Sequence, residues 1–104
     1  MKFARNTSMK YKPIYLPTAN LDIARMDKYL SEYPSKAKRI FQEMDKKVTD
    51  LETMPHMWPI YTAKPEYRRM ILEDYLLFYK IDEDNHMVRI YRILHGKMDI
   101  PEHF

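Results

Sequence analysis

The sequence predicts an α+β domain with the element order β-α-α-β-β-β, in which a helical hairpin packs on a mostly antiparallel four-stranded sheet. Two amphipathic segments separated by a proline predict the hairpin. Three short segments rich in Tyr, Ile, Leu and Val, separated by acidic turns, predict the strands that follow. With 104 residues the chain has room for one core. We expect an N-terminal extension over residues 1–8 and a single domain over residues 9–104.

Composition narrows the class of protein. A single glycine argues against Gly-rich phosphate loops and dinucleotide-binding fingerprints, which need several glycines. The absence of cysteine removes disulfides, zinc–thiolate sites and thiol nucleophiles, and it fits a reducing cytoplasm. The sequence has no apolar run near 18 residues and no signal-peptide pattern, so we expect a cytoplasmic protein without membrane contact. The net charge of +3 is a mild basic excess.

The first strand is expected over residues 9–16, at an edge or bulged at Pro13, because proline cannot donate to a ladder. Thr18 is a plausible N-cap for the first helix, which Pro34 ends, and Ser35 can cap the second. Apolar residues of the first helix recur at spacings of three and four: Ile23, Met26, Leu30 and Tyr33. The second helix carries an unbroken apolar stripe: Ala37, Ile40, Phe41, Met44, Val48 and Leu51.

Residues 54–65 contain three prolines and predict a connecting loop. Trp58 in this loop is expected to plug the open end of the core, and the alternative is an exposed recognition patch. The remaining strands are expected over residues 67–72, 75–81 and 87–94. Glu73-Asp74 and residues 82–85 supply the hairpin turns, and Asn85 is suited to a left-handed conformation.

Alternation along the last two strands assigns side chains to faces. On the third strand one face has Tyr75, Leu77, Tyr79 and Ile81, and the other has Leu76, Phe78 and Lys80. On the last strand one face has Met87, Arg89, Tyr91, Ile93 and His95, and the other has Val88, Ile90, Arg92 and Leu94. The candidate binding surface is basic and aromatic: Arg68, Arg69, Tyr75, Tyr79, Lys80, Arg89, Arg92, His95 and Lys97. The alternative is that the tyrosines pack at the core edge and the charges are solvated.

His95 is the one candidate for acid–base chemistry, because it lies beside Gly96 at an exposed strand end where a substrate can approach. The alternative is a local hydrogen-bonding role. The four histidines lack metal-ligand spacing, so we assign no metal, and no cofactor is implied. No Ser-His-Asp arrangement can be built, because the three serines fall in the extension or the helical hairpin.

The element order and three motifs resemble the RelE/ParE superfamily of small bacterial toxins over nearly all of residues 9–100. The motifs are YRR at the start of the second strand, YLLFYKID, and RILHGKMDI at the end. Members of this superfamily are toxins of two-gene toxin–antitoxin modules. Each toxin is held inactive by its cognate antitoxin, whose C-terminal segment becomes ordered when it binds the toxin surface. The resemblance therefore implies a cognate antitoxin as partner.

The RelE branch cuts messenger RNA on the ribosome with basic residues placed around the scissile phosphate. Resemblance to that branch implies catalytic roles for Arg69 and His95. Three other matched positions carry Leu76, Met98 and Phe104, which lack the guanidinium or phenol groups of the nucleases. Losing one such charge partner commonly costs about 3–4 kcal/mol of transition-state stabilisation. Little nuclease activity is therefore expected.

The ParE branch poisons DNA gyrase by binding, and its YRR, LFYK and ILHGKMD motifs match this sequence more closely. ParE proteins usually continue into a further C-terminal helix, whereas this sequence ends at Phe104. The resemblance implies a ParE-like toxin of the plasmid-stabilisation type that binds a cellular target. The alternatives are a ribosome-dependent endoribonuclease and an inactive toxin fold that only binds an antitoxin.

Overall fold

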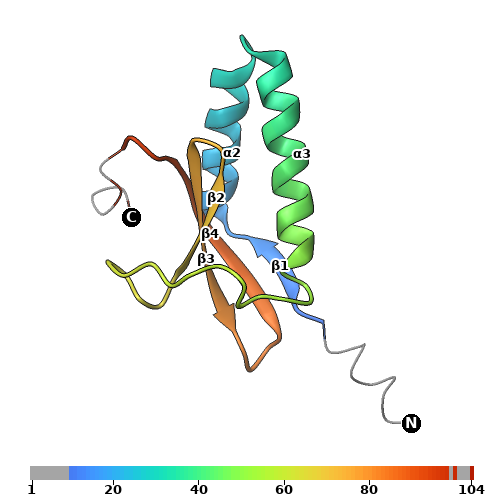
Figure 1. Cartoon of the computed structure of the whole chain (residues 1–104), viewed down its shortest axis with the longest axis vertical. Coiled ribbons are helices and arrows are strands. Elements are labelled where there is room, and N and C mark those ends of the chain that lie inside the picture. The colour runs from blue at the N-terminus through green and yellow to red at the C-terminus, as the bar shows by residue number, and fades with distance from the viewer. Residues whose placement is uncertain (1–9, 99, 101–103) are drawn as a thin grey trace.

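A computed structural model describes residues 10–98, 100 and 104 of the chain. The expected extension over residues 1–8 lies outside the described residues. The elements follow the predicted β-α-α-β-β-β order (Figure 1). Their bounds are β1 Lys12–Tyr15, α2 Pro17–Leu30, α3 Pro34–Asp50, β2 Arg68–Leu72, β3 Tyr75–Asp82 and β4 Met87–His95.

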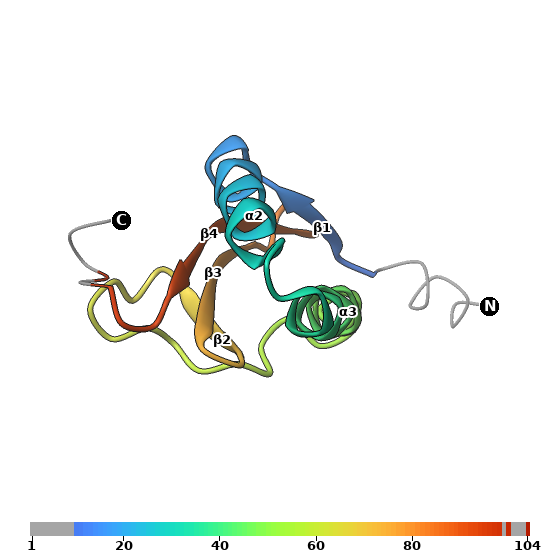
Figure 2. The ribbon, with the colours of Figure 1, turned by 90° about the horizontal axis from the view of Figure 1, so that it is seen from above.

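The four strands form one sheet in the order β1-β4-β3-β2. Strand β1 is parallel to β4, and the other two pairings are antiparallel, which confirms the mostly antiparallel sheet. Helix α2 packs on β4 and β1 while α3 packs on β2, so both helices cover the same face (Figure 2). The opposite face, called the outer face below, is covered by neither α2 nor α3.

Strand β1 lies at an edge of the sheet, as Pro13 predicts. The amides of Lys12 and Leu16 donate to carbonyls of His86 and Ile90 at 2.8 and 2.9 Å. Because directions alternate along a strand, the nitrogen of Pro13 faces the open edge, where no donor is needed. The proline therefore blunts this edge against pairing with another chain.

The apolar stripe predicted for α3 is confirmed, since Ile40, Met44, Val48 and Leu51 are buried in the main core. Both predicted N-caps are wrong. Each helix has a proline in its first turn, Pro17 in α2 and Pro34 in α3, so each begins one position before the expected cap. Thr18 lies inside α2, and its hydroxyl donates to the carbonyl of Tyr91 at 2.6 Å.

A β-bulge in β4 changes which side chains share a face. Phe78 pairs with Arg92 and Tyr79 pairs with Ile90, so Tyr91 is the extra residue. Ile90 and Ile93 consequently both join the core under the helices. The predicted single face over Met87, Arg89, Tyr91, Ile93 and His95 is wrong, because strict alternation stops at the bulge. The faces predicted for β3 are confirmed, with Tyr75, Leu77 and Tyr79 toward the helices and Phe78 in a separate cluster.

The two hairpin turns each contain one residue with positive φ. Glu73 has φ 56° as part of the two-residue turn between β2 and β3. In the second hairpin the left-handed residue is His86 (φ 51°), not Asn85 as expected. Asn85 instead bonds Asp82 through its backbone amide at 3.1 Å and its side chain at 2.9 Å. Arg89 donates to the same carboxylate at 2.9 Å.

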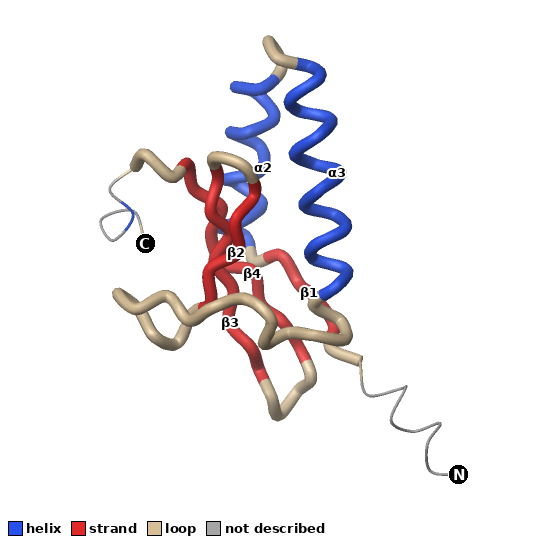
Figure 3. The backbone as a smooth tube through the Cα atoms, viewed as in Figure 1, coloured by secondary structure: helices blue, strands red, loops and turns tan. Residues whose placement is uncertain are grey.

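The segment between α3 and β2 is a loop, as its prolines predict (Figure 3). Trp58 packs against the main core, in agreement with its predicted role as a plug, and the Lys47 ammonium lies 5.1 Å from the ring centroid. Tyr79 is fully buried, and its hydroxyl donates to the carbonyl of Pro55 at 2.6 Å. Arg68 donates to the carbonyl of Trp58 at 2.7 Å. Sheet side chains thus hold the loop in place.

Helix α2 completes the edge of β4 where β1 ends. Beyond Ile90 the backbone of β4 has no strand beside it on that edge. Asp22 supplies the missing acceptor, because its carboxylate accepts the amide of Ile93 at 2.9 Å. The same carboxylate accepts Nε and Nη2 of Arg92 at 2.8 and 2.9 Å and Nη1 of Arg25 at 3.1 Å. Asp22 is only 3% exposed, and these bonds offset its desolvation.

We predict that Asp22→Ala lowers the free energy of unfolding by about 3–5 kcal/mol. It removes the carboxylate that binds Arg92, whose side chain is only 15% exposed, and it leaves the Ile93 amide without that acceptor. Asp22→Asn keeps an acceptor for the amide and should lose less. Urea denaturation measures both. The matched control is Asp27→Ala on the same helix, where the carboxylate is exposed and a change within about 0.5 kcal/mol is expected. Equal losses for Asp22→Ala and Asp27→Ala would contradict this account.

We also predict a low titration midpoint for Asp82. Hydrogen bonds from Asn85 and then Arg89 lower its pKa from 3.8 to about 2. Because the folded pKa is depressed, the stability it contributes is present above pH 4 and is lost as pH falls toward 2. Carboxyl chemical shifts measure the midpoint, which Asn85→Ala and Arg89→Ala should each raise. A midpoint near 3.8 in the unaltered protein would disprove this hydrogen-bonded turn.

Candidate functional site

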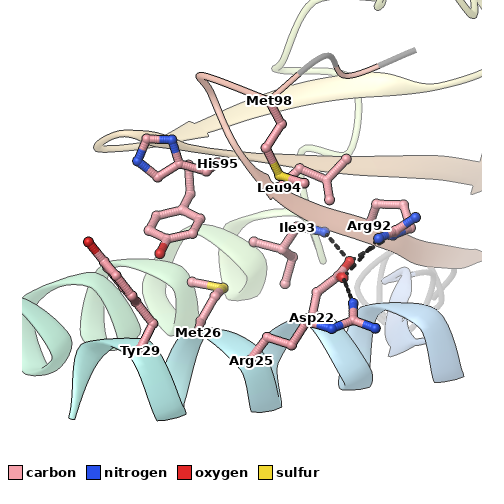
Figure 4. Close-up of a pocket in the computed structure, with 10 residues that line it drawn as sticks. Asp22, Arg25, Met26, Tyr29, Arg92, Ile93, Leu94, His95 and Met98 are labelled. Atoms are coloured by element: carbon pink, nitrogen blue, oxygen red, sulfur yellow. Dashed lines mark hydrogen bonds and ion pairs between the residues drawn. The ribbon is translucent and has the colours of Figure 1, made fainter. Parts of the chain in front are cut away.

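A hollow of about 450 Å³ opens between α2 and the end of β4 (Figure 4). Helix α2 contributes one wall and the last residues of β4 the other, with Met98 at the rim. The side chains that line it are Asp22, Arg25, Met26, Tyr29, Tyr75, Arg92, Ile93, Leu94, His95 and Met98. Tyr29 is 60% exposed, so this wall of the hollow offers an aromatic ring to a partner.

The charges at the inner end of the hollow are largely paired with one another. Arg92 is bound to Asp22, and this hydrogen bond raises the pKa of the guanidinium. Arg25 binds the same carboxylate, but its side chain is 70% exposed and its charge reaches the solvent. One buried carboxylate thus faces two guanidinium groups. The hollow keeps a cationic rim at Arg25, whereas Arg92 has a structural role.

His95 joins the end of β4 to the turn between β2 and β3. Its Nε2 lies 3.3 Å from Oδ2 of Asp74, and its Nδ1 accepts the amide of Lys97 at 3.2 Å. The Nδ1 contact identifies Nε2 as the protonated nitrogen of the neutral ring, which can then donate to Asp74. Tyr75 meets the imidazole edge-on at 5.2 Å between ring centroids. Both ring nitrogens therefore have intramolecular partners.

Asp74 is the centre of this junction. Lys36 of α3 donates to Oδ2 of Asp74 at 3.0 Å, and the amide of Gly96 donates to the Asp74 carbonyl at 2.8 Å. Partial burial acts to raise the pKa of Asp74, but the Lys36 hydrogen bond, a backbone hydrogen bond and the charge of Lys36 outweigh it and lower the pKa. A Cβ at Gly96 would come within 3.3 Å of that carbonyl, so the glycine permits a close approach.

The outer face of the sheet carries a different group of charges. Arg69 of β2 pairs with Phe78, and Lys80 of β3 pairs with Arg89 of β4. Since paired residues point to the same face, these cations flank the Phe78 ring on the side away from the helices. Lys80 is exposed. Arg69 forms no ion pair or side-chain hydrogen bond within the part of the chain that the structure describes.

Aromatic rings cover the middle of the outer face. Five of them form a cluster, called the outer aromatic cluster: Tyr61, Tyr67, Phe78, Tyr91 and Phe104. Neighbouring centroids lie 4.8–6.0 Å apart. Lys64 and Lys80 each place an ammonium 5.5 Å from a ring of the cluster. The outer face is thus both aromatic and cationic.

The residues predicted to form one binding surface fall in four places. Tyr75, Arg92 and His95 line the hollow, whereas Arg69, Lys80 and Arg89 belong to the outer face. Arg68 and Tyr79 hold the loop over the core, and Tyr79 is inaccessible to a partner. Lys97 is exposed in the turn after β4. Arg69 and His95 do not converge, because Arg69 lies on the outer face and His95 packs on Tyr75 under the helices.

Asp22 is the residue of the hollow that the sequence prediction missed. Its signal was present, because Asp22 shares the buried stripe of α2 with Ala19, Met26 and Leu30. A charged residue within an apolar stripe indicates a buried and paired carboxylate. No group of three His, Asp or Glu side chains in the described ranges is placed to hold a metal ion. No helix within those ranges is long and apolar enough to cross a membrane.

Residues 14–100 match the family model described as the ParE toxin of the type II toxin–antitoxin system parDE. No relative was found among curated proteins.

Solved toxin–antitoxin structures share the fold. A chain of the chromosomal ParDE system from Pseudomonas aeruginosa superposes with a TM-score of 0.70 at 16% identity, over 86% of this chain and 99% of that one. A chain of the RelBE2 complex from Mycobacterium tuberculosis gives 0.60 at 24% identity, over 83% and 98%. The archaeal RelE–RelB complex from Pyrococcus horikoshii gives 0.51 at 17% identity, over 85% and 97%. Because the matching family model spans most of the sequence, the chain belongs to the ParE toxin family of type II toxin–antitoxin systems.

Proposed function

We propose that the protein is a ParE-like toxin that stops growth by binding a cellular target, with DNA gyrase as the favoured target, and that a cognate antitoxin neutralises it. The main support for the proposal is that the side chains RNA cleavage would need lie far from one another in the structure. Arg69 and His95 lie on different sides of the sheet, and both nitrogens of His95 have intramolecular partners. A general base and a charge-stabilising cation must lie within reach of one phosphate.

The side chains at the matched nuclease positions support binding over catalysis. Leu76 packs against Phe78 and Leu94, and Phe104 is part of the outer aromatic cluster. Met98 lines the hollow. None of these three side chains can carry the positive charge or donate the proton that the cleavage of RNA requires. A toxin that acts by binding needs only a complementary surface, which the exposed cations supply.

Two surfaces are proposed for the partners. The outer face, with Arg69, Lys80 and Arg89, is proposed to meet the cellular target. Arg69 and Lys80 have no carboxylate partner among the described residues and are available for an acidic surface, whereas Arg89 is bound to Asp82. The hollow, with Tyr75 and the nearby Lys97, is proposed to receive the antitoxin. Support for an antitoxin comes from the fold neighbours, which are toxin–antitoxin complexes. Action on gyrase or on the ribosome implies a cytoplasmic protein, and a plasmid-stabilisation role is proposed with it.

A ribosome-dependent endoribonuclease is the second candidate. The outer face favours it in one respect, because cations interleaved with aromatic rings suit a single RNA strand. Arg69 would then be the cation nearest the phosphate. The missing partners at Leu76 and Phe104 count against this candidate.

We predict that induction of the protein without an antitoxin stops growth and that the purified protein inhibits gyrase supercoiling. Arg69→Ala combined with Lys80→Ala should raise the concentration for half-inhibition by about tenfold, since interface charges mainly set the association rate. The matched control is Lys38→Ala, an exposed lysine of α3 on the helix side. Supercoiling that is unchanged at high excess of protein would rule out gyrase as the target.

Primer extension on translated messages separates the two candidates. We expect no new 5′ ends after induction. New 5′ ends that disappear in Arg69→Ala would replace the proposed function with the endoribonuclease. Normal growth on induction would instead identify an inactive fold that only binds its antitoxin.

A further inference from the structure

The ring of Phe104 sits in a socket on the outer face of the sheet. The walls of the socket are the rings of Tyr61, Tyr67, Phe78 and Tyr91, at 6.0, 4.8, 4.9 and 5.3 Å between centroids. Phe104 meets Tyr67 and Phe78 edge-on, at interplanar angles of 64° and 78°. Edge-to-face contact on two sides with further rings on the others is a favourable environment for one phenyl group.

The socket is separate from the core that holds the domain together. Phe78, Leu94 and Ile100 form a small buried cluster on the outer face, whereas the main core lies under the helices. Phe104 is only partly buried. Its backbone oxygen accepts a long hydrogen bond of 3.4 Å from the Tyr91 hydroxyl. Phe104 therefore fills the socket without being part of the main core.

Cations surround the socket. The Lys64 ammonium lies 5.5 Å from the Phe104 ring centroid, and the Lys80 ammonium lies 5.5 Å from that of Tyr67. Arg69 is adjacent to Phe78 in the sheet register. None of these three cations forms an ion pair within the part of the chain described. The rim is therefore complementary to carboxylates that flank an aromatic side chain.

We propose that this socket is a docking site for a partner peptide that carries an aromatic side chain next to acidic residues, and that Phe104 is its intramolecular competitor. The inference goes beyond the proposed function, because it holds whether or not gyrase is the target. Phe104, which occupies the socket in the structure, shows what kind of side chain fits it. The sequence of residues 99–104, DIPEHF, combines two carboxylates with a phenylalanine, so this segment has the chemistry proposed for the partner.

A peptide fits the socket better than a nucleobase. Bases bind flat against an open aromatic face, but this socket has rings on several sides, and two of them meet Phe104 at steep interplanar angles of 64° and 78°. The Tyr91 hydroxyl also donates to a main-chain carbonyl, which a peptide offers at every residue. Binding of single-stranded RNA is therefore an outcome that the test must exclude.

The experiment uses the synthetic hexapeptide DIPEHF as the probe, added to the full-length chain with Phe104→Ala. NMR titration should show binding at least tenfold tighter to this variant than to the unaltered chain, because the tethered Phe104 competes at high effective concentration. The resonances of Tyr61, Tyr67 and Phe78 should shift most. A peptide with Phe replaced by Ala should bind at least tenfold more weakly.

Two further comparisons test the charge part of the proposal. A peptide with Asn and Gln in place of Asp and Glu should bind the Phe104→Ala chain severalfold more weakly than DIPEHF does. DIPEHF itself should bind severalfold more weakly to a chain that combines Phe104→Ala with Lys64→Ala. Lys38→Ala, added to Phe104→Ala, is the matched control and should leave binding unchanged. Higher salt should weaken the acidic peptide more than the neutral one.

Several results would overturn the proposal. One is equal binding of DIPEHF to the unaltered and Phe104→Ala chains, and another is no binding to the variant at millimolar peptide. Binding of a single-stranded oligouridylate, but not of the peptide, would assign the socket to RNA. Loss of the cooperative thermal transition in Phe104→Ala would also overturn it, because an exchangeable side chain cannot be one that the domain needs to fold.

Discussion

The carboxylate of Asp22 is the interaction on which the arrangement of this fold depends. Strand β1 has four residues and β4 has nine, so more than half of the β4 edge extends past its neighbour. A buried edge with unpaired amides is costly, and another strand would be the ordinary remedy. Here α2 takes that role, with Thr18 binding a carbonyl and Asp22 binding an amide of β4. The helix is thereby fixed directly over the end of β4.

That placement creates the hollow and also brings Asp22 and Arg92 together as an ion pair at its inner end. Arg92 projects from the strand just after the bulge and turns to Asp22 instead of solvent. A buried ion pair of this kind contributes more to a unique geometry than to net stability, since desolvation offsets much of its attraction. Because of this ion pair, the two sides of the sheet differ in how far their charges are paired. On the helix side they are mostly paired within the chain, and on the outer face Arg69 and Lys80 have no carboxylate among the described residues.

The sequence was sufficient for the elements whose signal is local. The stripe of α3, the edge position of β1 and the order of elements along the chain all follow from periodicity and proline chemistry. The errors came from positions where two local signals compete. Thr18 and Ser35 are good caps, but the preceding prolines with their fixed φ start each helix earlier. Asn85 tolerates positive φ, yet its bonds to Asp82 leave that conformation to His86.

The grouping of site residues could not be read from the sequence, because it depends on one extra residue in β4. A period of two cannot show that Tyr91 is a bulge, and one such residue transfers Ile93 and His95 to the other face. The pairing of Asp22 with Arg92 spans 70 residues and has no local signal at all. The bulge also separates His95 from Arg69, because His95 then packs on Tyr75 under the helices while Arg69 lies beside Phe78 on the outer face.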